Sequence, residues 1–227
     1  MGSADRFVRQ LGLPAIVEIG AGTGMFCSAM ARWLAPARVV GIDPSLPMLS
    51  QARRINAHPT VSYVAGTAEA VPTGTGLFDL ALLSRVIHHL PERAGAAREL
   101  SRVLRSGGTT VIRTTFQERL DALLYDYWPR LRELDKQRFP SRDEVLADFT
   151  GAGFTVRTVT SFAQPVSASL RQYHTRVSSR PQSKFSQITP EEFHDGLGRL
   201  EADAQAEPRA HPLAVVERYD LAVLTAP

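Results

Sequence analysis

The sequence predicts an α/β fold in which helices flank a doubly wound, mostly parallel sheet of seven strands, similar to a Rossmann fold. Two observations predict it. Short apolar runs alternate with segments of helical spacing through the first half of the chain. The first apolar run ends in a glycine-rich turn that enters a helix, as in ligand-binding α/β sheets. With 227 residues, the chain can form a single domain, 1–227, with a sizeable core.

Apolar runs bounded by turn residues give the positions of the elements. The run 78–84 is nearly all apolar, which is typical of a strand buried on both faces. We expect strands at 15–19, 38–42, 61–65, 78–84, 109–114, 154–162 and 217–225. We expect helices at 4–12, 24–35, 45–56, 91–104, 117–137, 141–151 and 190–205, and an irregular polar segment at 163–188. Insertions after the fifth and sixth strands, 116–140 and 163–206, are expected to form a helical lid on the substrate side.

The segment Glu18–Gly24 contains glycines at alternate positions directly after the first strand. Its spacing is G-x-G-x-G, whereas a dinucleotide-binding loop has G-x-G-x-x-G. A carboxylate at Glu18 would repel a pyrophosphate but suits an ammonium or sulfonium ligand. Asp43 ends the second strand, where a carboxylate can accept hydrogen bonds from both hydroxyls of a ribose. These features, with Gly66-Thr67 and Ser84-Arg85, all follow strands and therefore predict one site at the carboxyl edge of the sheet.

Residues 15–115 resemble the class I S-adenosylmethionine (SAM)-dependent methyltransferases, in the small-molecule group related to the quinone C-methyltransferases (type 11). The resemblance is carried by Glu18–Gly24, Asp43, 66–72, 78–91 and 98–108. It implies SAM as cofactor and S-adenosylhomocysteine (SAH) as product. It implies cofactor binding by Glu18, Gly20, Ala21, Gly22, Gly24, Asp43, Pro44, Met48, Thr67, Ala68, Glu69, Ser84 and Arg85.

Two positions depart from the pattern of that family. Thr67 stands where the family has an aspartate that contacts the adenine amino group; its hydroxyl can accept a hydrogen bond but carries no charge. Ser106 replaces the usual proline, and the following glycine pair still provides the turn. Glu69 is either a cofactor ligand or a surface residue at a helix start.

Histidines and a tyrosine are the candidate catalytic residues. His88 could act as a general base near neutral pH, since histidine titrates there without perturbation. His89 fits a loop-anchoring role better, and His174 and Tyr173 are further candidates. We expect no metal site, because a pair of histidines falls short of the three or four ligands that a site needs.

The segment 165–190 is basic and contains no acidic residue. It suits an anionic substrate, because arginine binds carboxylate, sulfate or phosphate in a bidentate manner; an ordinary solvated loop is an equal alternative. Its cations are Arg171, Arg176, Arg180 and Lys184. The candidate substrate-binding residues are Arg113, Tyr125, Arg171 and Arg176. Tyr125, Tyr127 and Trp128 fit packing better than catalysis.

Composition narrows the class of protein. A net charge of +3 with no basic run argues against nucleic-acid binding. No apolar stretch approaches the ~20 residues of a membrane helix, and the start lacks a signal-peptide core.

The single cysteine, Cys27, excludes an internal disulfide and fits a reducing, cytoplasmic compartment. Its place on an apolar helix face predicts a buried small hydrophobe. Because little chain precedes the first strand, three arrangements are open: an open site, closure by residues 117–137, or completion of the lid by a partner chain or a homodimer.

The sequence therefore predicts a SAM-dependent methyltransferase acting on a small, anionic metabolite of specialised biosynthesis. One alternative is a different reaction on the same scaffold, an elimination or an intramolecular cyclisation that expels sulfate or phosphate. The other is a SAM-binding subunit that supports a partner without catalysis. The sequence leaves open the substrate and whether carbon, nitrogen or oxygen would be methylated.

Overall fold

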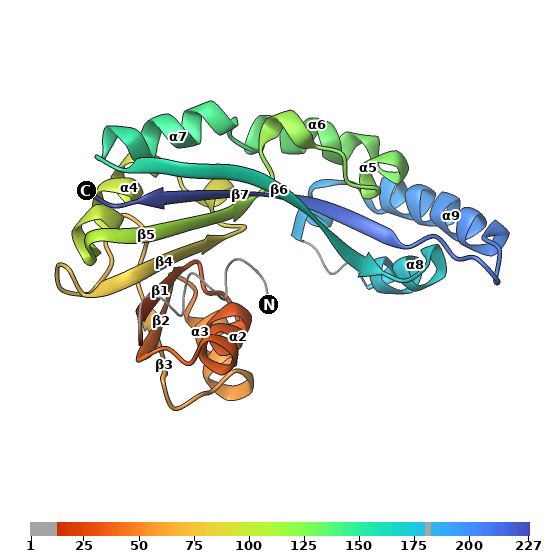
Figure 1. Ribbon diagram of the computed structural model, residues 1–227. Coiled ribbons are helices and arrows are strands. Elements are labelled where there is room, and N and C mark those ends of the chain that lie inside the picture. The colour runs from red at the N-terminus through yellow and green to blue at the C-terminus, as the bar shows by residue number, and fades with distance from the viewer. Residues whose placement is uncertain (1–12, 180–182) are drawn as a thin grey trace. The chain divides into compact units, whose positions relative to one another are not determined.

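A computed structural model describes residues 13–179 and 183–227 (Figure 1). The expected helix 4–12 and Arg180 lie outside the described residues. The chain divides into two compact units, which we describe separately. Unit 1 comprises the chain up to Thr114, Arg142–Thr160 and Leu221–Pro227, and unit 2 comprises Thr115–Ser141 and Ser161–Asp220. The segments 116–140 and 163–206 belong to unit 2; their role as a lid stays a prediction.

The sheet has the strand order β3-β2-β1-β4-β5-β7-β6. Its strands are β1 (Ala15–Ile19), β2 (Arg38–Asp43), β3 (Val61–Ala65), β4 (Phe78–Ser84), β5 (Leu104–Thr114), β6 (Thr155–Ser167) and β7 (Val215–Thr225). From β3 to β5 the neighbouring strands pair in parallel. The amide of Ala226, at the end of β7, donates to the carbonyl of Gly108 near the start of β5, so β7 runs antiparallel to β5. The predicted mostly parallel seven-stranded sheet is confirmed.

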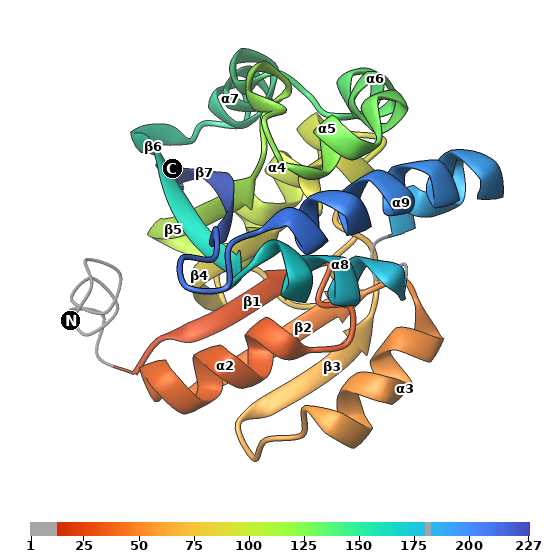
Figure 2. The same cartoon turned by 90° about the vertical axis from the view of Figure 1, so that its right-hand side faces the viewer.

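Helices follow the strands of unit 1 in alternation. They are α2 (Met25–Leu34), α3 (Leu46–Ile55), α4 (Arg93–Val103) and α7 (Arg142–Gly151). Helix α2 packs beside β2, and α3 packs beside β3 (Figure 2). Ser45 caps α3 by accepting a hydrogen bond from the amide of Met48, as the Pro44-Ser45 pair in the sequence suggests. Strand β1 is buried along its whole length and lies between β2 and β4.

Unit 2 is built from helices together with the unit-2 parts of β6 and β7. Its helices are α5 (Leu124–Tyr127), α6 (Pro129–Arg138), α8 (Leu170–Ser178) and α9 (Pro190–Ala206). The prediction of one continuous helix over 117–137 is wrong. Pro129 starts α6, and Trp128 before it adopts an extended φ of −129° because a residue before proline is driven out of the helical region. The apolar spacing across this break is real, but it belongs to two helices and a preceding turn.

The prediction of an irregular segment over 163–188 is also wrong. Strand β6 continues to Ser167, and α8 follows it directly. Ser169 caps α8 by accepting from the amide of Gln172, and the helix buries only Tyr173 and Val177. Two buried positions in nine give a weak apolar pattern, which explains why the polar composition concealed the helix.

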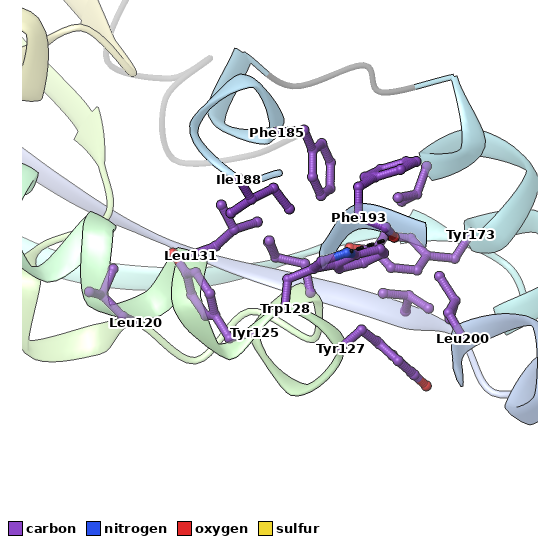
Figure 3. Packing of buried hydrophobic residues seen from close by; sticks show 13 residues of the cluster. Leu120, Tyr125, Tyr127, Trp128, Leu131, Tyr173, Phe185, Ile188, Phe193 and Leu200 are labelled. Atoms are coloured by element: carbon purple, nitrogen blue, oxygen red, sulfur yellow. Dashed lines mark hydrogen bonds between the residues drawn. The ribbon is translucent and has the colours of Figure 1, made fainter. Parts of the chain in front are cut away.

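Aromatic side chains form the core of unit 2 (Figure 3). The rings of Trp128 and Phe193 stack with centroids 5.8 Å apart, and Phe185 meets Trp128 edge-on at 5.1 Å. The indole nitrogen of Trp128 donates to the carbonyl of Phe193 at 3.1 Å. Gly196 is needed here, because a Cβ at that position would overlap the Trp128 ring. No helix in the described part of the chain is long and apolar enough to cross a membrane.

Candidate cofactor-binding site

The glycine loop after β1 has a backbone conformation that requires glycine. Gly20, Gly22 and Gly24 have φ values of +71°, +54° and +80°. The amides of Gly20 and Ala21 both donate to the carbonyl of Ile42, at 2.8 and 3.0 Å, which ties the loop to β2. A Cβ on Gly20 would lie 2.5 Å from a methyl carbon of Val86. Both the turn and the close packing against the loop after β4 therefore select glycine at this position.

The side chains of Tyr63 and Asn56 hold the glycine loop in place through hydrogen bonds to its backbone. The hydroxyl of Tyr63 lies 3.2 Å from the carbonyl oxygen of Gly24 and 2.9 Å from that of Asn56. The side-chain amide of Asn56 donates to the carbonyl of Thr23 at 2.7 Å. A Cβ on Gly24 would overlap the Tyr63 ring. These contacts hold the loop in place before any ligand arrives, which reduces the entropy that binding must overcome.

Asp43 lies at the carboxyl end of β2 and links the glycine loop to the start of α3. Its two oxygens accept hydrogen bonds from the amides of Gly22 and Ser45, both at 2.8 Å. A carboxylate offers about four acceptor positions, so each oxygen keeps one for a further donor. The side chain is buried among protein atoms yet lines a cavity. It is therefore held rigidly and can still accept from the hydroxyls of a bound ligand.

Unit 1 contains a cavity of about 490 Å³ at this edge of the sheet. Its wall is formed by the ends of β1 and β2, the segments after β3 and β4, and the start of α3. The lining residues are Ile19, Gly20, Gly22, Ile42, Asp43, Pro44, Ser45, Met48, Gly66, Thr67, Ala68, Glu69, Arg85, Val86, His89, Leu90 and Pro91. Acceptors at Asp43 and Glu69 thus combine with apolar surface, as expected of a site for a small organic ligand.

Most of the cofactor-binding residues expected from the sequence line this cavity. They are Gly20, Gly22, Asp43, Pro44, Met48, Thr67, Ala68, Glu69 and Arg85. Ala21, Gly24, Ser84 and Glu18 are not among the lining residues. Ala21 and Gly24 shape the loop, and Ser84 ends β4 beside Arg113. The sequence reasoning did not assign Val86, Leu90 and Pro91 to the site, although they lie inside the segment 78–91 that it singled out.

Glu18 lies buried in β1, with 2% of its surface exposed, and contacts a cysteine. The thiol of Cys27 on α2 donates to its carboxylate at 2.9 Å. Burial raises the pKa of Glu18 from 4.5 to about 7, and the charge of Asp43 adds to this rise, while the hydrogen bond from Cys27 opposes it. Burial also raises the pKa of Cys27, so the thiol stays protonated. Cys27 is fully buried, which confirms the expectation for this residue.

The two adjacent histidines occupy a 3-10 turn, Ile87–His89, after β4. Their ring centroids are 4.3 Å apart. His89 lines the cavity, whereas His88 does not. The sequence favours the opposite arrangement, with His88 toward the substrate. Which of the two histidines takes a proton stays a prediction, and no cluster of metal-ligating side chains occurs among the residues described.

Arg113 is the candidate substrate-binding residue that lies in unit 1. It sits near the end of β5, pairs in register with Ser84 of β4 and donates to the Ser84 hydroxyl at 3.4 Å. Its guanidinium carbon lies 5.6 Å from the ring centroid of Phe26. A half-buried cation therefore occupies the same carboxyl edge of the sheet as the glycine loop.

The remaining candidates lie in unit 2, where most of them have structural partners. Arg171 donates to the carbonyls of Ala204 and Glu207, both at 2.8 Å, at the end of α9. Arg176 donates to the carbonyl of Val166 at 2.8 Å. Tyr173 is 2% exposed in the aromatic core, and burial raises its pKa, which disfavours proton abstraction by its phenolate. His174 is half-buried on α8.

A buried polar network holds the last of these candidates, Tyr125. Its hydroxyl donates to the carboxylate of Asp135 at 2.7 Å, and the ammonium of Lys184 contacts the same oxygen at 2.6 Å. Asp135 is 1% exposed. Burial and the adjacent carboxylate raise the pKa of Tyr125. This arrangement joins α5, α6 and the turn Ser183–Gln187, so it has a clear structural role.

The cavity-forming half of the chain matches a known family. Residues 17–112 match a family model described as a methyltransferase domain. Over these residues the chain is therefore similar to methyltransferases. The chain is 32% identical over 112 residues to a demethylmenaquinone methyltransferase of Roseiflexus castenholzii, a match that covers 49% of this chain and 47% of that relative. It is 33% identical over 156 residues to a malonyl-acyl carrier protein O-methyltransferase of Pseudescherichia vulneris, covering 66% of this chain and 59% of the relative.

A solved structure shows the same fold over nearly the whole chain. It is described as a methyltransferase from an antibiotic biosynthesis pathway of Anabaena variabilis. The match has a TM-score of 0.73 and 25% identity, and covers 98% of this chain and 97% of that structure. The chain spans about half the length, or less, of the first curated relatives it matches. The similarity to a methyltransferase domain covers residues 17–112, while the similarity in fold covers nearly the whole chain.

The similarity to methyltransferases implies SAM as the cofactor, and the residues of the cavity fit that molecule. Asp43 offers acceptor positions for the two hydroxyls of a ribose. Gly20 and Gly22 leave the backbone open to close approach. Thr67, Ala68 and Glu69 form a further part of the wall, at the end of the cavity that follows β3. The cavity therefore provides a formed site for such a cofactor.

Proposed function

We propose that this chain is a SAM-dependent methyltransferase acting on a small molecule. The observation that carries the proposal is the cavity bounded by the glycine loop and Asp43, within residues that match a methyltransferase domain. Because the matched relatives extend well beyond this chain, its activity and substrate are inferences from the site. The quinone and acyl carrier protein methyltransferases among those relatives support a non-nucleic-acid acceptor.

The residues that would hold SAM follow from the wall of the cavity. Asp43 would accept from the ribose hydroxyls, the backbone at Gly20 and Gly22 would bind the amino-acid end, and the Thr67–Glu69 segment would face the base. Bound SAM supplies an electrophilic methyl group. The task of the chain is then to orient the acceptor and exclude water, and positioning alone can lower a barrier by several kcal/mol, on the order of 7–11 in favourable cases.

Proton removal, where the acceptor requires it, is proposed for His88 or His174, with Tyr173 as a third candidate. Histidine is suited to this step because it titrates near neutral pH. His89 joins the candidates because it lines the cavity. Tyr173 has the least support, since burial raises its pKa. Single His→Gln variants that keep SAH affinity but lower turnover would identify the base.

The proposal includes an anionic substrate and a role in specialised metabolism. The described pathway of the Anabaena variabilis structure supports the metabolic role. Arg113 supports the anionic substrate, since it is a half-buried cation at the edge of the sheet that carries the cavity. Arg171 and Lys184 contribute less, because each already binds protein oxygens. Completion of the substrate side by a partner chain or a second copy stays a prediction.

Calorimetry with SAM and SAH tests the proposal first. We expect binding that Asp43→Asn weakens. Asp79→Asn is the matched control, because Asp79 also accepts a backbone amide, from Ala15, but lies outside the cavity wall. Absence of binding would refute the proposal. Mass spectrometry of candidate substrates should then detect the gain of one methylene unit and the formation of SAH. Binding without any methylated product would favour an elimination, a cyclisation or a non-catalytic SAM-binding subunit.

A further inference from the structure

Arg85 lies on the cavity wall and has a left-handed backbone conformation although it is not a glycine. Its φ is +58°, and Ala35 is the other such residue in the described part of the chain. A side chain in this region crowds its own backbone, so the conformation costs free energy that glycine would avoid. Residues held in this way cluster at functional sites. The conformation of Arg85 therefore points to a role for its side chain.

Contacts on both sides of Arg85 hold its backbone in this conformation. Its amide donates to the carbonyl of Arg113 at 2.7 Å, which continues the pairing of β4 with β5 by one residue. The next residue, Val86, packs so closely against Gly20 that a Cβ on the glycine would lie 2.5 Å from its methyl carbon. The amide of His89 donates to the carbonyl of Val86 at 2.7 Å and closes the turn. The surrounding fold thus fixes the point from which the side chain of Arg85 extends.

The guanidinium of Arg85 is available to a ligand. The residue is exposed and lines the cavity. Within residues 13–179 and 183–227, its side chain makes neither a hydrogen bond nor an ion pair. The carboxylate of Asp43, on the same wall, is held instead by the amides of Gly22 and Ser45. The wall therefore presents a cation that no acidic side chain neutralises.

A cation at this position is unfavourable for the proposed cofactor by itself. The sulfonium of SAM is positive, and two like charges in one cavity repel each other. The amino-acid end of SAM carries an ammonium beside its carboxylate, so the net charge of that end is zero. Arg113, in register with Ser84 at the neighbouring strand end, adds a second cation to the same edge of the sheet. Two guanidinium groups at this edge therefore favour a further anion, which the acceptor would carry.

We propose that Arg85 binds a carboxylate, sulfate or phosphate group of the acceptor and makes the site selective for anionic substrates. This inference rests on the proposed function and adds the residue that recognises the substrate. The N–H groups of a guanidinium match two oxygens of such an anion in a bidentate pair. The bound anion would also reduce the repulsion between Arg85 and the sulfonium, so that acceptor and SAM favour each other's binding.

The first test uses sulfate as the probe, titrated by NMR into the full chain loaded with SAH. Loading with SAH keeps the cofactor's own carboxylate in place, and sodium chloride keeps the ionic strength constant. Arg85→Asn should weaken sulfate binding by at least about tenfold, the scale of one hydrogen bond to a charged group. Asparagine suits this position because it tolerates a positive φ and carries no charge. Arg85→Lys, which keeps the charge without the bidentate geometry, should give an intermediate affinity.

Arg85→Gly and Ala35→Gly form a matched pair that separates backbone conformation from binding. Each variant places glycine at a position with positive φ, so neither should lower the midpoint of thermal unfolding. Only Arg85→Gly should lose sulfate binding, because Ala35 ends α2 and lies outside the cavity wall. A lower midpoint in Arg85→Gly with unchanged sulfate affinity would show that the side chain is structural and would overturn the inference.

The second test asks whether the anion belongs to the acceptor or to the cofactor. 5′-Methylthioadenosine has the base, ribose and sulfur of SAH but lacks the amino-acid end with its carboxylate. Arg85→Asn should leave the affinities for both ligands unchanged. A loss confined to SAH would assign Arg85 to the cofactor's carboxylate and overturn the inference. A wild-type chain that binds SAH but not sulfate, or sulfate as tightly as Arg85→Asn does, would overturn this inference alone. A chain that does not bind SAH would refute the proposed function as well.

Discussion

We expect the free energy of unfolding of wild type to fall as the pH rises, because Glu18 ionises. Replacing Glu18 by glutamine should remove this loss. The carboxylate is 2% exposed, and burial raises its pKa from 4.5 to about 7. Between these two values the folded chain binds one proton more than the unfolded chain, so the free energy of unfolding falls with rising pH. The contribution of Glu18 is therefore fully present below pH 4.5 and is lost as the pH rises through about 7.

The size of the effect follows from the pKa difference. One pKa unit corresponds to 1.36 kcal/mol, so the shift from 4.5 to about 7 corresponds to about 3 kcal/mol. Glutamine keeps the shape and an acceptor for the Cys27 thiol but does not ionise. Relative to wild type, Glu18→Gln should gain about 3 kcal/mol between pH 4.5 and 8. Glu99, whose pKa is lowered by Arg102, acts in the opposite direction in both proteins and cancels in the comparison.

Urea denaturation at several pH values measures this difference. Cys27→Ala provides a second check, because the thiol's hydrogen bond lowers the pKa of Glu18. Its removal should move the inflection in stability to higher pH. If the stability gap between wild type and Glu18→Gln is the same at pH 5 and pH 8, burial does not perturb Glu18 as described, and the reasoning fails.

Three further substitutions test the site and its support. Asp43→Asn should weaken SAH binding about 10- to 100-fold in calorimetry, because asparagine has one acceptor oxygen where the carboxylate has two. Gly20→Ala should lower the free energy of unfolding by about 2 kcal/mol more than Gly76→Ala. Both glycines have a positive φ, but only a Cβ at position 20 would clash with Val86. Equal losses of stability in the two variants would contradict this. Asp135→Asn should cost about 3–5 kcal/mol in chemical denaturation, since it removes the buried carboxylate charge beside the ammonium of Lys184; a loss below 1 kcal/mol would exclude that role.

The elements that the sequence predicted well are those specified by neighbouring residues. The run 15–19 and the alternating glycines after it predict a strand and a turn, and both are present. Asp43 could be placed at the site because a parallel strand ends at the same sheet edge as its neighbours. Such features depend on backbone conformation within a few residues, which composition and spacing express directly.

One error has a local cause, because the spacing of leucines across 117–137 predicts one helix, yet Pro129 divides it. The others arise where contacts distant in sequence decide the outcome. Arg171 looks like a free cation in a basic segment, but the carbonyls at the end of α9 take its donors. Glu18 precedes the glycines in sequence, but its carboxylate is buried against Cys27.

The sequence by itself determined the methyltransferase resemblance, the order of strands and helices in the first half, and the residue types around the glycine loop. Only the tertiary structure decided which of those residues line the cavity, that His89 does so, and that Glu18 is buried against Cys27. The physical reason is that local patterns specify backbone conformation, whereas burial and hydrogen bonding depend on which elements pack together. The glycine loop illustrates both, since its glycines are readable in the sequence and the Val86 contact that requires Gly20 is not.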